Sequence, residues 1–139
     1  MIRKNKKNPK VVAVLGAGNF GTAISQVLAE NGHRVHLWNW EQDHTPLKQI
    51  EQHSENRKYL PGVRLLKQVM PTYNIEAAVE SAEAVFFAIP STAMEHVVSF
   101  GARSISNRAV LVNLSKGLHP ELHKPMSTII SKHVRPALK

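Results

Sequence analysis

Three glycines form the most chemically informative pattern in the sequence. Gly16, Gly18 and Gly21 are spaced as Gly-x-Gly-x-x-Gly. In this spacing the first glycine lets the chain turn sharply, the second lets the backbone approach a pyrophosphate, and the third lets a helix pack closely on a strand. The free N–H groups at the start of that helix, and its dipole, would face the phosphates. The motif predicts a dinucleotide-binding turn, with a tight turn that binds nothing as the alternative.

The segments on either side of the glycines are those that such a turn requires. Residues 11–15 are a continuous apolar run, which is typical of a strand buried on both faces. Residues 22–31 have the apolar spacing of one helical face and end before a glycine. Residues 35–38 predict a second strand. Together these segments have the length of a βαβ unit, which makes the motif more specific than the glycines alone.

The rest of the chain continues the alternation of strands and helices. We expect further strands at 69–73, where Pro71 interrupts the run, at 84–89 and at 109–114. We expect helices at 41–52, at 75–81, at 92–105 with Ser91 as the cap, and at 126–134 starting near Pro125, with a loop at 53–63. This alternation predicts an α/β fold, a Rossmann-type doubly wound parallel sheet.

The end of the second predicted strand would meet the adenosine ribose of a bound dinucleotide. NAD-binding domains place an acidic residue there, about 20 residues after the glycines. This chain has Asn39 and Trp40 instead, with Glu41 and Asp43 just beyond. Asn39 could hydrogen-bond a ribose and Trp40 could lie against the adenine, but neither is an Arg that would hold a 2′-phosphate. The sequence therefore leaves NAD and NADP both open.

The composition predicts a soluble cytoplasmic protein with one folded domain. The chain has 139 residues and no cysteine. No apolar run approaches the roughly 18 residues that span a bilayer, so no membrane association is expected. The N-terminus has neither the apolar core of a signal peptide nor the character of a transit peptide. We expect residues 1–10 to be a basic disordered tail and residues 11–139 to be one dinucleotide-binding domain.

The positive charge lies mainly at the two ends of the chain. Residues 1–10 carry five Lys or Arg and no acid, residues 11–102 carry six against nine Asp or Glu, and residues 103–139 carry seven against one. A basic chain suggests nucleic-acid binding. Here the basic tail has no interleaved aromatic residues, so a solvated tail is favoured and no nucleic-acid partner is expected. Nucleic-acid binding remains the alternative outside metabolism.

One pair of histidines has a spacing that can bind metals. His119 and His123 are four residues apart, as in a helical metal pair. Pro120 lies between them and no third ligand is suggested. We therefore expect no metal site.

Four motifs resemble the N-terminal domain of the soluble NAD(P)-dependent sn-glycerol-3-phosphate dehydrogenases. The glycine turn, Gly-Ala-Gly-Asn-Phe-Gly-Thr-Ala at 16–23, is one. The others are Asn-Arg-Lys-Tyr-Leu-Pro-Gly at 56–62, Ile-Pro-Ser at 89–91 and Ser-Lys-Gly at 115–117. Their order and their extent, about residues 11–118, make the resemblance more specific than a glycine loop.

The resemblance implies an activity and a set of binding residues. The family interconverts dihydroxyacetone phosphate and sn-glycerol 3-phosphate by hydride transfer with a nicotinamide cofactor. Trp40 occupies a place where many members have Arg or His. The implied cofactor contacts in this sequence are Gly16, Gly18, Asn19, Phe20, Gly21, Asn39, Trp40, Tyr59, Pro90 and Lys116. Lys116 would also reach the substrate, where an ammonium can neutralise a phosphate or polarise a carbonyl; a solvated turn lysine is the alternative.

The resemblance also implies what these 139 residues lack. Family members continue with a sixth strand and an all-helical domain that supplies the catalytic lysine and the substrate phosphate site. We therefore expect no catalytic residue in this chain and a sheet that is incomplete at its C-terminal edge. That edge would favour self-association, as in a homodimer. Three hypotheses stay open: a dehydrogenase chain or its N-terminal part, a module that only binds NAD(H), and an inactive gene remnant.

Overall fold

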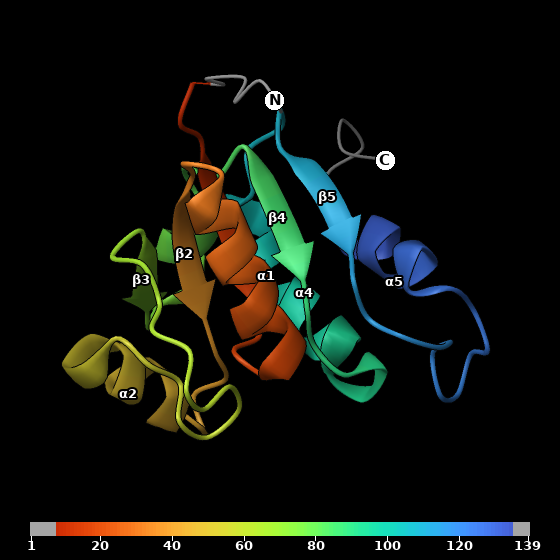
Figure 1. The fold of residues 1–139 in the computed structure, drawn as a ribbon. Helices are drawn as coiled ribbons and strands as arrows, with labels where there is room; N and C mark the ends of the chain where they lie inside the picture. The colour runs from red at the N-terminus through yellow and green to blue at the C-terminus, as the bar shows by residue number, and fades with distance from the viewer. Residues whose placement is uncertain (1–7, 135–139) are drawn as a thin grey trace, which may run out of the picture.

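The protein contains a five-stranded parallel sheet with helices on both faces (Figure 1). The structure is a computed structural model and describes residues 8–134. Its elements are β1 (Val11–Leu15), α1 (Asn19–Glu30), β2 (Arg34–Trp38), α2 (Thr45–His53), β3 (Val69–Thr72), α3 (Ile75–Val79), β4 (Ala84–Phe87), η1 (Ser91–Ala93), α4 (Met94–Gly101), η2 (Ala102–Ser104), β5 (Val110–Asn113) and α5 (Met126–His133). The strand order is β3-β2-β1-β4-β5. The chain therefore builds outward from β1 in one direction and then crosses over to β4, which confirms the doubly wound α/β prediction.

Two apolar cores lie on opposite faces of the sheet. Val12 and Val14 of β1 join the core that α1 and α2 cover. Ala13 and Leu15 of the same strand join the core under α3, α4 and α5. Because side chains alternate along a strand, a strand that is covered on both faces must be apolar at every position. This is the physical reason for the unbroken apolar run at 11–15.

Pro71 is accommodated because β3 lies at one edge of the sheet. It pairs in register with Leu37 of β2, the one strand beside β3 in the sheet that residues 8–134 form. Proline has no N–H for the ladder, and an edge strand has one unpaired side on which that loss is tolerated. The interrupted third strand is thus confirmed.

Several predicted helix boundaries are wrong, and Ser91 is not a helix cap. Ser91 is the first residue of the 3-10 turn η1, Pro90 precedes it as the cap residue, and no side chain caps η1. α4 begins only at Met94, so the predicted helix at 92–105 is three shorter pieces. The predicted helix at 41–52 begins later, at Thr45, because residues 40–43 form a turn in which the Asp43 N–H donates to the Trp40 carbonyl oxygen. The expected start near Pro125 is confirmed, since α5 begins at Met126.

A cluster of charged and imidazole groups connects α4 to α5. One carboxylate oxygen of Glu95 accepts from Lys132 Nζ at 3.1 Å and contacts His133 Nε2 at 3.2 Å. The other lies 3.6 Å from His119 Nε2. The hydrogen bonds from Lys132 and His133 lower the pKa of Glu95 below its ordinary value of 4.5. These contacts hold α5 on the face that α4 helps to cover.

This cluster predicts a specific pH dependence of stability. A carboxyl whose pKa is lower in the folded state stabilises the fold above its ordinary pKa, and that stabilisation is lost as the pH falls through the folded value. Glu95→Gln should therefore lower the urea midpoint at neutral pH, and the difference from wild type should shrink on acidification. Glu121→Gln, for which the structure gives no ion pair, is the control. An identical pH profile for Glu95→Gln and wild type would contradict the prediction.

Candidate functional site

The three motif glycines differ in whether packing requires glycine at their position. A Cβ atom on Gly16, which has a φ of 113°, would overlap the carbonyl oxygen of Ala88. One on Gly21 would overlap the carbonyl oxygen of Gly16. Gly18 has an ordinary φ of −75° and is the cap residue of α1, and a Cβ there would have no atom within 4 Å. Packing thus requires glycine at 16 and 21, whereas position 18 faces open space.

Side-chain amides hold the middle of the glycine turn from two sides. The Ala17 N–H donates to Asn39 Oδ1 at 3.0 Å, and Asn56 Nδ2 donates to the Ala17 carbonyl oxygen at 2.9 Å. Asn56 Nδ2 also donates to Thr22 Oγ1 at 2.8 Å, and the residue is 0% exposed. Unpaired buried peptide groups are costly, so these two asparagines set the backbone path of the turn.

Asn56 contacts the glycine turn, although it is not among the ten residues predicted to bind the cofactor. It lies in a segment that was correctly predicted to be a loop, but loops seldom carry fully buried polar side chains. Its place at the start of the Asn-x-x-Tyr-Leu-Pro match was the available signal. Its Oδ1 also accepts from the Tyr59 N–H at 3.2 Å, so it orders the loop itself.

The segment after β2 is anchored through Asp43. Asn39 Nδ2 donates to the Asp43 carbonyl oxygen at 2.7 Å. The Asp43 carboxylate accepts from Lys58 Nζ at 2.7 Å and from the Tyr59 hydroxyl at 3.1 Å. Partial burial raises the pKa of Asp43, but hydrogen bonds from Lys58, Tyr59 and Thr45 outweigh it, so that pKa is lowered. The carboxylate stays ionised and offsets the Lys58 charge.

A hollow of about 250 Å³ lies at the carboxyl ends of β1, β2 and β4. It is lined by Gly16, Gly18, Trp38, Asn39, Trp40, Tyr59, Ala88, Ile89, Pro90, Ala93 and Val97. Six of the ten expected cofactor residues are thereby brought together: Gly16, Gly18, Asn39, Trp40, Tyr59 and Pro90. This is the position where the strand order reverses, which is where doubly wound sheets bind ligands.

The other four expected residues do not line this hollow. Asn19, Phe20 and Gly21 form the first turn of α1, where Gly21 is buried and Phe20 is 58% exposed. Lys116 follows β5 and is exposed. Its neighbour Ser115 donates a hydrogen bond to the carbonyl oxygen of Ile89, which lines the hollow. The Lys116 loop is therefore attached to the segment that follows β4.

Trp40 stands between this hollow and a second one of about 300 Å³, and it lines both. The Trp40 ring meets Trp38 edge to face at 5.9 Å and tilts against His96 at 4.8 Å. His96 in turn contacts Phe100 at 4.8 Å. Such aromatic contacts hold the Trp40 ring in one orientation.

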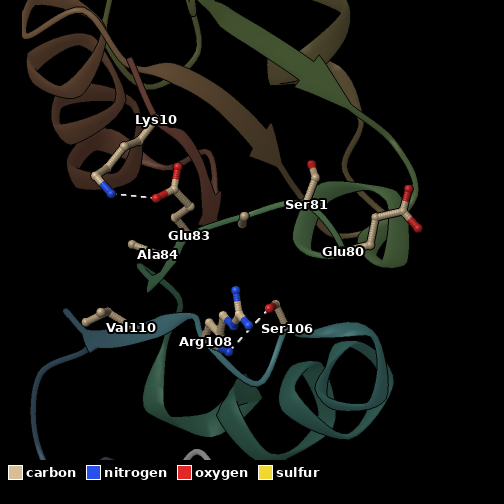
Figure 2. A pocket seen from close by; sticks show the side chains of 9 residues that line it. Lys10, Glu80, Ser81, Glu83, Ala84, Ser106, Arg108 and Val110 are labelled. Atoms are coloured by element: carbon tan, nitrogen blue, oxygen red, sulfur yellow. Dashed lines mark hydrogen bonds and ion pairs between the residues drawn. The ribbon is translucent and has the colours of Figure 1, made fainter. Parts of the chain in front are cut away.

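A third hollow, of about 530 Å³, lies at the opposite end of the sheet (Figure 2). Its walls include Lys10, Ala84 and Val110, which lie just before or at the beginnings of β1, β4 and β5. In Figure 2, Lys10 points to Glu83, with which it forms an ion pair. Its volume is larger, but it shares no residue with the glycine turn, so the site is the smaller hollow.

Within residues 8–134, no group of three or more His, Cys, Asp or Glu could hold a metal ion. His119 Nδ1 accepts instead from the backbone N–H groups of Glu121 and Leu122. None of the helices in the described part of the chain is long and apolar enough to cross a membrane.

The burial of Asn56 predicts a large effect on stability. Asn56→Ala leaves the Ala17 carbonyl oxygen without its partner, which should lower the free energy of unfolding by about 1–3 kcal/mol. Asn31→Ala is the matched control, because that exposed side chain makes one hydrogen bond to a helix end. Urea denaturation compares the two variants with wild type. Equal losses for both would show that Asn56 does not hold the turn.

Comparisons with known proteins identify the family. The chain matches the family model for the N-terminus of NAD-dependent glycerol-3-phosphate dehydrogenase over residues 11–138. It is 41% identical over 123 residues to the glycerol-3-phosphate dehydrogenase (NAD(P)+) of Pseudomonas syringae pathovar tomato, covering 88% of this chain and 35% of that protein. The Bacillus licheniformis enzyme of the same name is 34% identical over 128 residues, covering 92% and 36%.

A solved structure agrees with these sequence matches. The crystal structure of glycerol-3-phosphate dehydrogenase from Coxiella burnetii superposes with a TM-score of 0.82 and 25% identity, covering 91% of this chain and 38% of that one. The chain thus spans little more than a third of the length of these relatives. The glycine turn at the switch point, the buried loop asparagine and these matches confirm the resemblance: the chain belongs to the family of NAD-dependent glycerol-3-phosphate dehydrogenase N-termini.

Proposed function

We propose that the hollow beside the glycine turn binds a nicotinamide dinucleotide, NAD or NADP, as the cofactor part of a glycerol-3-phosphate dehydrogenase. One observation carries the proposal. Packing accounts for the glycines at 16 and 21, but nothing in the described fold occupies the space that a side chain at Gly18 would fill. Since this space lies at the start of α1, it suits a pyrophosphate that needs close approach to backbone N–H groups.

The residues around the hollow have distinct proposed roles. The first turn of α1, with Gly18, Asn19, Phe20 and Gly21, supplies N–H groups to the phosphates, while Gly16 makes the turn. Asn39 and Trp40 lie where the adenosine end would be, and Tyr59 and Pro90 also line the hollow. Asn39 and Asn56 keep the turn in its binding shape before the ligand arrives, which lowers the entropic cost of binding.

The reaction proposed for the whole protein interconverts dihydroxyacetone phosphate and sn-glycerol 3-phosphate. When bound, the cofactor supplies or accepts a hydride at the substrate carbon. Lys116, on the loop that Ser115 attaches to Ile89, is the described residue that would offer a positive charge to substrate phosphate or carbonyl oxygen. A cytoplasmic location and a homodimer stay predictions, and nucleic-acid binding stays the alternative.

Gly18→Val tests the cofactor site. The open space and ordinary φ at this position mean that the variant should fold with an unchanged thermal midpoint. The added side chain would occupy the pyrophosphate position, so NADH affinity should fall at least tenfold, or about 1.4 kcal/mol. Titration of NADH fluorescence measures the loss, and Gly18→Ala should lie between. An unchanged titration curve for Gly18→Val would refute the glycine-turn proposal.

The lining of the hollow predicts binding without turnover by these 139 residues. None of its eleven residues is Lys, His, Asp or Glu, Tyr59 is engaged with Asp43, and the exposed Lys116 lies outside the lining, where it can offer charge to the substrate but is not held beside the reacting carbon. Reduction of a carbonyl requires a proton donor beside the reacting carbon. The 139-residue chain should therefore oxidise NADH no faster with dihydroxyacetone phosphate than without it, as followed by absorbance. Substrate-dependent oxidation would contradict this and favour a self-sufficient enzyme.

A further inference from the structure

We infer that the site selects NAD(H) over NADP(H), with Trp40 and Glu41 as the residues that determine the choice. The inference rests on the proposed function, since it concerns the adenosine end of the same site. The two cofactors differ by one phosphate on the ribose 2′-oxygen, which adds close to two negative charges at neutral pH. A site that accepts NADP(H) must therefore supply a positive group there.

The carboxyl end of β2 locates the adenosine ribose. β2 ends at Trp38, and Asn39 is joined to the phosphate-binding turn by its hydrogen bond from the Ala17 N–H. In doubly wound dinucleotide sites the ribose hydroxyls face this point of the chain. The ribose would thus lie beyond Asn39, and the residues that follow β2 surround its 2′-oxygen.

Both polar atoms of Asn39 already make a hydrogen bond within the protein. Its Oδ1 accepts from the Ala17 N–H at 3.0 Å, and its Nδ2 donates to the Asp43 carbonyl oxygen at 2.7 Å. The second N–H of this amide is uncharged, so it cannot offset the negative charge of a phosphate as an Arg or Lys would. A neutral 2′-hydroxyl needs only an acceptor, and carboxylates are strong acceptors.

The surroundings of Trp40 carry two carboxylates and one imidazole, that of His96, but no Lys or Arg in their lining. The hollow on the far side of Trp40 is lined by Glu41 and Glu76, and no Lys or Arg is among its ten lining residues. The hollow beside the glycine turn has no charged residue at all in its lining. Both carboxylates are exposed, so they would repel a 2′-phosphate at this end of the site through solvent, over the distance that salt allows.

Lys58 does not supply the positive charge that a 2′-phosphate would need. Its ammonium lies 2.7 Å from Asp43 Oδ2 and 5.1 Å from the centroid of the Tyr59 ring. To reach a phosphate it would have to leave Asp43, whose carboxylate would then be unpaired beside the same site. The Lys58–Asp43 pair is therefore electrically neutral toward a ligand.

Trp40 contributes to the preference for NAD(H) by its aromatic shape as well as by its lack of charge. Its contacts with Trp38 and His96 hold an aromatic face at the adenosine end, where adenine can stack. An Arg at this position would bring a guanidinium to the 2′-oxygen. The tryptophan thus favours the adenine ring that both cofactors share and offers nothing to the phosphate that distinguishes them.

The test compares NADH and NADPH by fluorescence titration of the 139-residue chain. Wild type should bind NADH at least about tenfold more tightly than NADPH, and added salt should narrow the gap because the discrimination is electrostatic. Trp40→Arg should raise NADPH affinity, and Glu41→Gln should reduce the NADH preference severalfold. Glu80→Gln, in the hollow at the opposite end of the sheet, should leave both affinities unchanged.

Each result separates the inference from the function on which it rests. Tight NADH binding with equal or tighter NADPH binding would overturn the cofactor preference and leave the proposed function standing. Binding of neither cofactor would overturn both. A strong NADH preference that Trp40→Arg and Glu41→Gln both leave unchanged would overturn the assignment to these two residues.

Discussion

The close approach of α1 to the end of β1 is the constraint on which the rest of the site depends. Gly21 lies so near the Gly16 carbonyl oxygen, and Gly16 so near Ala88, that neither position has room for a Cβ atom. This contact joins β1, α1 and the segment after β4 into one unit. It also points the start of α1 at the hollow between them, so a packing requirement and a binding geometry have the same origin.

Side-chain hydrogen bonds hold the middle of the glycine turn in place. Asn39 and Asn56 satisfy the N–H and the carbonyl oxygen of Ala17, and each comes from a different connection. Asp43 continues the network to Lys58 and Tyr59. Loops that would otherwise be variable in shape are thereby tied to the phosphate-binding turn. Because these loops are ordered when the protein folds, a ligand does not have to order them when it binds.

The charged residues at the carboxyl ends of the strands differ from those at the amino ends. At the carboxyl ends, the hollow beside the glycines is uncharged and the adjoining one is acidic. At the amino ends, Lys10 and Glu83 form an exposed pair that solvent screens, so it contributes little. The basic character of the whole chain therefore says little about the charge at the site, because neither of the two hollows at the carboxyl ends has a Lys or Arg in its lining.

The sequence by itself determined the α/β class, the parallel sheet and the family. Three local patterns carried this information: the apolar strand at 11–15, the glycine spacing and the four ordered motifs. Local patterns can be recognised without knowledge of the fold. Only the tertiary structure decided which residues meet. Asn56 has no local pattern that marks it as buried, because its partners Ala17 and Thr22 lie more than thirty positions away. The folded chain also shows that Ser91–Ala93 form a 3-10 turn before α4 and that Lys116 lies outside the lining of the hollow, while its cofactor and substrate contacts stay predictions. Contacts between distant segments depend on how the strands are ordered, and that order is a property of the packed sheet rather than of any stretch of chain.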